Sequence, residues 1–196
     1  LKNQKETYVI LTDANIAVNF DFKAMLQAHI DSGADVTIAY NEQELPESLV
    51  KLPSNGRCFY YTFEVEDGRV TKIYVNSKES GVQNFSMNMY VLEREFLISL
   101  IEEAYVHGHE FFERDILVPK LNQLNVQAYK CEDYIARIND LKSYFDENMK
   151  LLDDYNLNAL FSGPPIYTKL HGGNPTRYID GCKAQNVMAA DGCIIE

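Results

Sequence analysis

The chain has 196 residues, with 18 basic and 29 acidic side chains and a formal charge of −11. Hydrophobic residues make up 46% of it, enough apolar material for a buried core, and this excludes a disordered chain. The acidic balance argues against partners such as nucleic acid or an anionic membrane surface, because both need clustered Lys and Arg. No apolar run is long enough to span a bilayer, and the start lacks the order of a signal peptide. We therefore expect a cytoplasmic globular protein.

Both ends of the sequence predict a piece of a longer protein. The chain begins at Leu1 without a methionine, and its last residues, GCIIE, stop within an apolar pattern. A sheet that lacks its first strands has an open edge and exposed core. We therefore expect the chain to dimerise or aggregate through that edge.

The cysteines predict neither a zinc site nor disulfides. None of them forms a C-x-x-C pair or has the histidine spacing of a zinc site. A chain this rich in apolar residues does not need disulfides to fold. We expect reduced thiols at all four positions, Cys58, Cys131, Cys182 and Cys193.

The first forty residues predict a strand, a helix and a second strand. Tyr8–Leu11 is a short apolar run typical of a buried strand. Apolar residues at helical spacing follow over 22–30, with Asp21 suited to the N-cap and Gly33 to the C-terminal stop. Asp35–Tyr40 reads as the next strand. A strand, helix and strand this close together predict a βαβ crossover and hence a parallel sheet.

The middle of the chain is rich in strand-forming residues. Cys58–Glu66 and Val70–Val75 flank Asp67-Gly68, a strong hairpin signal. Phe85–Val91 alternates apolar residues with Ser86, Asn88 and Tyr90. This polar row on one face of the strand is expected either to line a pocket or to face water.

Helical patterns dominate the next part of the chain. Apolar residues at helical spacing over 96–105 are stopped by Gly108. Phe111–Leu121 also has a helical pattern, which Pro119 should end or kink. Val126–Ile135 reads as extended chain, and Asp140 is placed to cap a third helix.

The last part changes texture. Residues 161–180 are rich in Pro and Gly and predict an irregular linker after an α/β domain over 1–160. In 181–196, Val187 and Cys193 lie six residues apart beside an Asp-Gly turn, which is compatible with the first coil of a β-helix. A short terminal strand is the alternative.

Asp13 is the first candidate for chemistry. It comes directly after a predicted buried strand, and ligands of open parallel sheets bind outside the carboxyl ends of the strands. A carboxylate there is placed to hold Mg²⁺ against a phosphate. The alternative is an Asx turn without a ligand.

The histidines offer a weaker metal hypothesis. His107 and His109 flank a glycine and would suit a metal pair, but two histidines at a helix C-terminus are also favoured by the helix dipole. His29 lies on the apolar face of its helix, so we expect a core histidine.

Five segments, in their order along the chain, resemble the sugar-nucleotide pyrophosphorylases and more narrowly bacterial ADP-glucose pyrophosphorylase. The first resembles the family's strand, Gly-Asp-His-like loop, helix and strand, and the last resembles the linker into its left-handed β-helix. They are YVILTDANIAVNFDFKAMLQAHIDSGADVTIAY, FSMNMYVLEREFL, FFERDILVPKL, YIARINDLKSYFDENMKLL and PPIYTKLHGGNPTRY.

The resemblance implies a fold and a reaction. The fold is an α/β, Rossmann-like nucleotidyltransferase, a mostly parallel sheet flanked by helices, followed by the start of a left-handed parallel β-helix. Residues 1–160 would be the C-terminal part of the nucleotidyltransferase domain, 161–180 the linker and 181–196 the first β-helix coil. The reaction is glucose-1-phosphate adenylyltransferase: ATP and glucose 1-phosphate give ADP-glucose for glycogen and pyrophosphate. It is an in-line attack that needs charge neutralisation and positioning.

The chain departs from the family where catalysis needs its ligands. Active members hold Mg²⁺ with two carboxylates, clamp the sugar phosphate with a lysine and cradle the triphosphate in a Gly-rich loop. Here Asp13 keeps the first carboxylate, but Arg137 falls at the position of the second carboxylate. A cation there would repel the metal by about 4 kcal/mol per unit charge at ~4 Å and a dielectric near 20. Asn76 falls at the lysine, with Lys78 two residues on as a possible substitute. The Gly-rich loop is absent, as expected if an N-terminal part is missing.

The substrate-binding strand keeps part of the family pattern. Ser86 and Met87 remain, and Asn88 replaces a glycine, which adds a side chain where the sugar would lie. These departures resemble the D-type subunit of some Gram-positive bacteria, which has an eroded site and pairs with a catalytic subunit in a hetero-oligomer.

Three functions follow from these features. The first is a regulatory, weakly active or inactive ADP-glucose pyrophosphorylase subunit that binds ATP and glucose 1-phosphate or an effector. The second is a working nucleotidyltransferase with a rearranged Mg²⁺ site built on Asp13 and either Asp133 or Asp140. The third is a plain sugar- or nucleotide-binding module.

Overall fold

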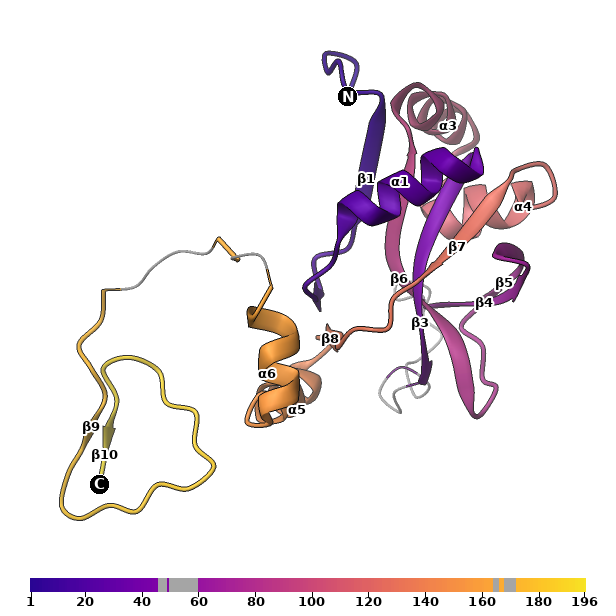
Figure 1. The fold of residues 1–196 in the computed structure, drawn as a ribbon. Helices are drawn as coiled ribbons and strands as arrows, with labels where there is room; N and C mark the ends of the chain where they lie inside the picture. Colours follow the sequence, from indigo (N-terminus) through magenta and orange to yellow (C-terminus); the bar gives the residue numbers. More distant parts are fainter. Residues whose placement is uncertain (46–48, 50–59, 164–165, 168–171) are drawn as a thin grey trace. The chain divides into compact units, whose positions relative to one another are not determined.

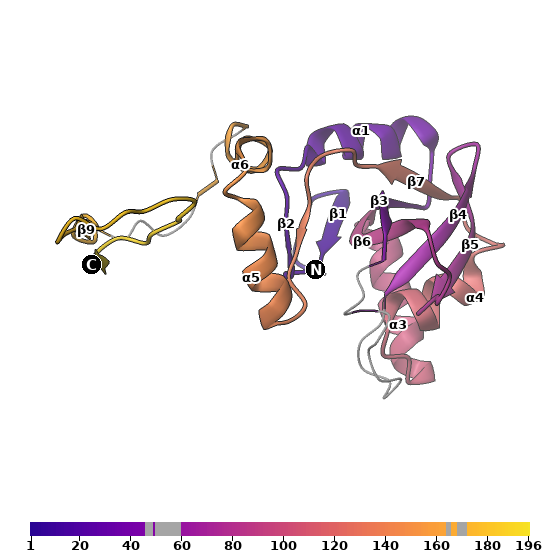
Figure 2. The same cartoon turned by 90° about the horizontal axis from the view of Figure 1, so that it is seen from below.

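The computed structural model describes residues 1–45, 49, 60–163, 166–167 and 172–196. The chain forms two compact units (Figures 1 and 2). Unit 1 comprises Leu1–Ala14 and Asp21–Glu132, and unit 2 comprises Asn15–Phe20 and Asp133–Glu196. The predicted borders at 160 and 180 stay predictions.

Unit 1 is built on one mixed sheet. The strand order is β1-β6-β3-β7-β5-β4, and β4 pairs again with β6. This last pairing closes β6, β3, β7, β5 and β4 into a five-stranded barrel, with β1 attached to β6. Only β3 and β7 are parallel neighbours among the described strands of this sheet. The strands are β1 (Tyr8–Thr12), β3 (Val36–Glu44), β4 (Tyr61–Glu66), β5 (Arg69–Val75), β6 (Val82–Glu93) and β7 (Val126–Lys130).

The predicted Rossmann-like, mostly parallel sheet is wrong. β1 and β3 run in the same direction, as expected for strands joined through a helix, but β6 lies between them and is antiparallel to both. The predicted hairpin at Asp67-Gly68 is correct, and both residues have positive φ, 50° and 79°. Its two strands curl round to pair with β6 and β7 instead of extending a parallel sheet.

The helices of unit 1 begin and end where the capping residues predict. In α1 (Phe22–Ser32), the Asp21 side chain accepts hydrogen bonds from the backbone N–H groups of Lys23 and Ala24, both at 2.9 Å. Gly33 ends this helix with φ 58°, and Gly108 ends α3 (Arg94–His107) with φ 69°. The two helices lie on opposite sides of the sheet (Figure 2).

The segment around Pro119 is helical but irregular. It forms a π-helical turn, η1 (Phe112–Leu117), followed by the short α4 (Val118–Lys120). The Val118 N–H bonds to the Glu113 carbonyl, five residues back, which is the spacing of a π-turn. A proline cannot donate in the helical ladder, so the prediction of a break near this residue is confirmed.

β6 is buried on both of its faces. The largest hydrophobic cluster of unit 1 includes Tyr90 and Leu92 of this strand together with Leu97 of α3. Met87, on the other face of β6, is fully buried. Ser86 and Tyr90 are also buried, at 0% and 3% exposure, so the expectation that the polar row faces water is wrong for these two residues. A strand covered on both sides has no water-facing row.

Unit 2 has short elements. β2 (Ile16–Ala17) pairs antiparallel with β8 (Ala136–Arg137), and β9 (Arg177–Tyr178) pairs in parallel with β10 (Ile194–Ile195). The latter pair shows a short strand near the end of the sequence, and the β-helix coil over 181–196 stays a prediction. The helices are α5 (Leu141–Lys150), with a capping box between Asp140 and Ser143, and α6 (Asp154–Phe161), which the sequence patterns missed.

Several smaller predictions also have an outcome. Cys131, Cys182 and Cys193 are free thiols, whereas Cys58 lies outside the described residues. His29 is a core residue with 2% exposure. No helix in the described part of the chain is long and apolar enough to cross a bilayer.

Candidate functional site

The candidate site lies where the strand next to β6 changes from β1 to β4. Residues 89–93 of β6 pair with β1, whereas Asn84 and Phe85 pair with β4. On the other side β6 pairs with β3 throughout, but its register shifts: Ala39 faces Met89 and the next residue, Tyr40, faces Ser86. Two residues of β6, Met87 and Asn88, are therefore extra and form a bulge. Bulges re-aim side chains and are frequent next to functional sites.

Asn88 is turned toward Asp13 by this bulge. Its φ is +51°, in the left-handed region that asparagine tolerates better than most residues. Its side-chain Nδ2 donates to Asp13 Oδ2 at 2.6 Å, and its carbonyl accepts from the Asp13 N–H at 3.3 Å. Asn88 N–H in turn donates to Ser86 Oγ at 3.0 Å. The structure thus brings three predicted site residues, Asp13, Ser86 and Asn88, into one connected group, and the fourth, Met87, is buried beside them.

A buried polar chain continues behind Ser86. The Tyr90 hydroxyl hydrogen-bonds with Ser86 and donates to the Glu113 carboxylate, and Tyr61 shares a hydrogen bond with the same carboxylate. Burial is the main reason that the pKa of Tyr90 lies well above its usual value, and the pKa of Tyr61 is also raised by burial. Both phenols therefore keep their protons and act as donors at neutral pH.

This buried chain was not found from the sequence. The strand pattern at Phe85–Val91 placed Tyr90 in the polar row but gave it no partner. The partner, Glu113, lies in the π-helical turn. The sequence feature that could have indicated it is a carboxylate within the apolar run FFERDIL. Its meaning depends on a contact between residues 23 positions apart, which no local pattern shows.

Asn76 and Lys78 lie elsewhere, after the end of β5. Asn76 has φ +53°, its N–H donates to the Tyr60 carbonyl at 2.9 Å, and its side-chain Oδ1 accepts from the Tyr60 N–H at 3.0 Å. The backbone and the side chain of Asn76 therefore together continue the hydrogen-bond ladder between β4 and β5. Lys78 is exposed, and its ammonium group has no ion pair with any residue in the described ranges.

Arg137 belongs to unit 2, whereas Asp13 belongs to unit 1. Arg137 lies in β8 opposite Ile16 and is 9% exposed. The neighbouring Ile138 N–H donates to the Asn15 carbonyl at 2.8 Å, which continues this short ladder.

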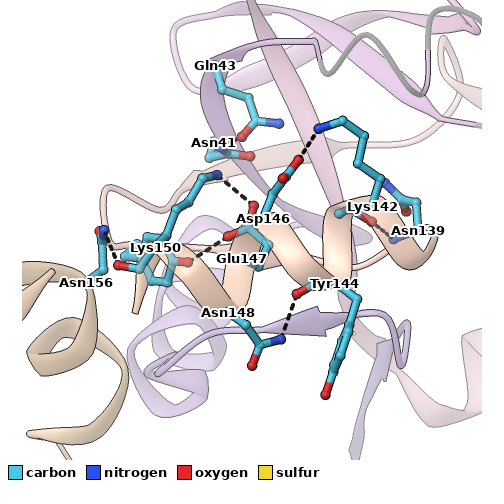
Figure 3. A network of polar contacts seen from close by, with 12 residues as sticks. Asn41, Gln43, Asn139, Lys142, Tyr144, Asp146, Glu147, Asn148, Lys150 and Asn156 are labelled. Carbon is cyan, nitrogen blue, oxygen red and sulfur yellow. Dashed lines mark hydrogen bonds and ion pairs between the residues drawn. The ribbon is translucent and has the colours of Figure 1, made fainter. Parts of the chain in front are cut away.

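The helix after Arg137 has its own polar network. Along α5, Lys142 pairs with Asp146 and Lys150 with Glu147 (Figure 3). Asp140, one of the alternative metal ligands, accepts a hydrogen bond from Ser143 N at 2.6 Å as the N-cap of this helix. Asp133, the other alternative, is exposed.

The donor set around Asp13 does not fit the magnesium cage that the family resemblance implies. One oxygen of the single carboxylate already accepts the Asn88 amide hydrogen bond. In the sequence, the residue that the resemblance aligns with the second carboxylate is Arg137, whose guanidinium carries only donors and cannot ligate a cation. His107 and His109 stack at 5.5 Å at the end of α3, with His107 Nδ1 2.8 Å from the Glu103 carbonyl. No group of three His, Cys, Asp or Glu side chains within the described ranges is arranged to hold a metal.

No protein-family model matches this chain.

Proposed function

We propose that this chain is a regulatory, catalytically inactive or weakly active relative of ADP-glucose pyrophosphorylase. It binds a sugar phosphate or a nucleotide beside Asp13 without turning it over. The ordered resemblance of five segments supports the family. The observation that carries the loss of activity is the 2.6 Å hydrogen bond from Asn88 to Asp13.

The hydrogen bond changes what Asp13 can do. A carboxylate that holds a divalent cation directs its lone pairs to the metal, and active family members have a glycine at the position of Asn88. Here the carboxamide donates to that carboxylate instead and adds a side chain next to it. Asn88 Oδ1 is buried and accepts no hydrogen bond from a described residue. A carboxamide oxygen is an acceptor that suits the hydroxyl group of a sugar.

The fate of the phosphate-clamping position supports the same proposal. Asn76 uses its backbone and its side chain to hold Tyr60, so it contributes to the ladder and has no charge to offer a phosphate. A weakened phosphate clamp and a carboxylate without its partner together remove the electrostatic stabilisation on which phosphoryl transfer depends. Regulation would then operate through an assembly with a catalytic subunit.

The test compares binding with turnover in the same preparation. Titration calorimetry with ATP and with glucose 1-phosphate is expected to give heat for at least one ligand. Pyrophosphorolysis of ADP-glucose with Mg²⁺ is expected to stay at background. A turnover equal to that of a catalytic pyrophosphorylase, or no binding of either ligand, contradicts the proposal.

Two substitutions sharpen the test. The double variant Asn88→Gly with Arg137→Asp returns both departures to the family pattern, and glycine accepts the positive φ at position 88 without strain. It is expected to gain pyrophosphorolysis. The matched control is Asn88→Gly with Arg137→Leu, which removes the cation and adds no metal ligand, so it should gain nothing. Equal turnover in both double variants contradicts the assigned role of position 137.

The working enzyme with a rearranged metal site receives no support from the geometry. Asp140 is committed to the N-terminus of α5 through its hydrogen bond with Ser143. In that alternative, Arg137→Asp would lower activity or leave it unchanged, so the gain expected above separates the two functions.

A further inference from the structure

The hydrogen bonds behind Asn88 all run in one direction. Asn88 N–H donates to Ser86 Oγ at 3.0 Å, and the Ser86 hydroxyl hydrogen-bonds with the Tyr90 hydroxyl. The Tyr90 hydroxyl donates to the Glu113 carboxylate, and a carboxylate offers only acceptors. Because Tyr90 has a single proton and gives it to Glu113, its oxygen accepts the Ser86 proton. The Ser86 oxygen is then turned toward the Asn88 N–H, so the carboxylate at the far end sets the direction of the whole chain.

Glu113 is held in place by the π-helical turn η1. A π-turn contains one more residue than an α-helical turn and re-aims the side chains around it. At the start of η1, Asp115 Oδ2 accepts from the backbone N–H groups of Glu110 and Phe111, both at 3.0 Å. Tyr61 supplies a second phenol to the Glu113 carboxylate. The far end of the hydrogen-bond chain is therefore fixed to the helical segment that follows α3.

The near end of the chain holds Asn88 in its unusual conformation. A bond from an N–H to a serine oxygen two residues back competes with regular strand pairing, and Asn88 lies in the bulge with φ +51°. This conformation costs energy for a residue other than glycine. A serine side chain has three staggered positions, and the bond with Tyr90 favours the one that serves Asn88. From this backbone conformation the carboxamide reaches Asp13 Oδ2 at 2.6 Å.

We propose that Glu113 and Tyr90 are positioning residues for the site beside Asp13. They act through Ser86 to hold the Asn88 carboxamide in place, and they thereby set how tightly the site binds its ligand. The effect on affinity rests on the proposed function, whereas the positioning of Asn88 does not.

Two tyrosine variants separate positioning from simple filling of the core. Tyr90→Phe keeps the ring and removes the hydroxyl that links Ser86 to Glu113. Tyr61→Phe is the matched control, because it removes the other phenol from the same carboxylate and leaves the chain to Asn88 intact. Each variant leaves the carboxylate with one donor fewer, so similar losses of stability are expected, and urea unfolding checks this.

The side-chain amide of Asn88 gives a readout that needs no ligand. In a proton–nitrogen correlation spectrum, its pair of resonances is the pair that disappears in Asn88→Gly. The bond to the Asp13 carboxylate should displace one of the two protons downfield in the wild type. Tyr90→Phe is expected to lose this displacement, and Tyr61→Phe is expected to keep it. An unchanged resonance in Tyr90→Phe, or an equal loss in both variants, overturns the proposal.

Titration calorimetry with glucose 1-phosphate measures the effect on affinity. Tyr90→Phe should raise Kd about tenfold, the factor expected for the loss of one hydrogen bond, and Tyr61→Phe should leave Kd within about twofold of the wild type. Equal Kd values in the wild type and Tyr90→Phe overturn the effect on affinity. A wild type that binds neither glucose 1-phosphate nor ATP contradicts the proposed function instead, and the Asn88 resonances then still decide the positioning.

A second pair of variants replaces the first pair if the single tyrosine changes prevent folding. Adding Glu113→Gln to each removes the charge that has lost a donor, and the new carboxamide oxygen still accepts from the remaining phenol. The chain to Asn88 then stays connected with Tyr61→Phe and is broken with Tyr90→Phe. The same difference in the Asn88 resonances is expected, and equal resonances in the two double variants overturn the proposal.

Discussion

Two buried threonines allow a direct measurement of what a single buried hydrogen bond contributes to this fold. Thr37 of β3 and Thr62 of β4 are 2% and 0% exposed. Thr37 Oγ1 lies 2.8 Å from Nδ1 of His29, itself 2% exposed. Thr62 Oγ1 is buried without a hydrogen-bond partner among the described residues. Replacement by valine keeps the shape of either side chain and removes the hydroxyl, so the two variants differ in the bond alone.

The expected free-energy changes have different magnitudes and can differ in sign. Thr37→Val leaves a ring nitrogen of His29 buried without a partner, which costs about 1–3 kcal/mol. Thr62→Val removes a hydroxyl that is already unsatisfied, so it should be neutral or stabilise the fold by up to about 1 kcal/mol. At this chain length each kcal/mol moves Tm by roughly 2–4 °C.

Urea unfolding followed by far-UV circular dichroism measures both variants at the same pH, with the slope of the transition checked to be unchanged. Thirteen tyrosines and no tryptophan make tyrosine fluorescence a second probe. Equal destabilisation by the two substitutions would refute the reasoning, because loss of a hydroxyl would then matter and its hydrogen bond would not. Stabilisation by Thr37→Val would refute it as well.

Three further changes have defined outcomes. Burial lowers the pKa of His29 below its unfolded value of 6.5, so the unfolded chain binds more protons than the folded chain just below that value. The free energy of unfolding should therefore fall as the pH drops through this window. Urea titrations at several pH values should show a weaker dependence of this free energy on pH in His29→Leu. Asp140→Ala removes the capping box of α5 and should cost about 1 kcal/mol of helix stability, measured by circular dichroism against the exposed control Asp133→Ala. Asn76→Lys loses the acceptor for Tyr60 N–H and puts a long side chain at φ +53°, so thermal unfolding should show a loss of about 1–3 kcal/mol rather than a restored phosphate clamp.

Local signals in this sequence predicted local structure well. A side-chain cap such as Asp21, a left-handed glycine such as Gly33 and an Asp-Gly turn act on backbone groups within a few residues, and the structure confirms each of them. The energy of these features depends on neighbours in the chain, so the letters alone carry the information. Helix α6 was missed for the related reason that its cap, Asp153, comes only three residues after the end of α5 and reads as part of one longer helix.

The pairing of the strands could not be predicted from local sequence signals in the same way. Nothing in the apolar run of β1 states whether its neighbour will be β3, reached through α1, or β6, which is about seventy residues further on. A strand that is buried on both faces has the same composition in a parallel sheet and in this closed mixed sheet. The assumption that helix-linked strands are adjacent was therefore the step that failed, and the fold class failed with it.

The candidate site shows how this failure matters for function. The carboxylate of Asp13 was predicted to lie at the carboxyl end of a strand, and it does, at the end of β1. Its neighbour is decided by the antiparallel strand β6 and by a two-residue bulge, neither of which a parallel model contains. The bulge gives Asn88 its positive φ and brings its amide to Asp13. The sequence predicted that Asn88 adds a side chain where the sugar would lie, and the structure shows that the same side chain also donates a hydrogen bond to the Asp13 carboxylate. Removing it as Asn88→Gly tests both roles at once, since the variant lacks the added side chain and leaves Asp13 Oδ2 without the Asn88 hydrogen bond.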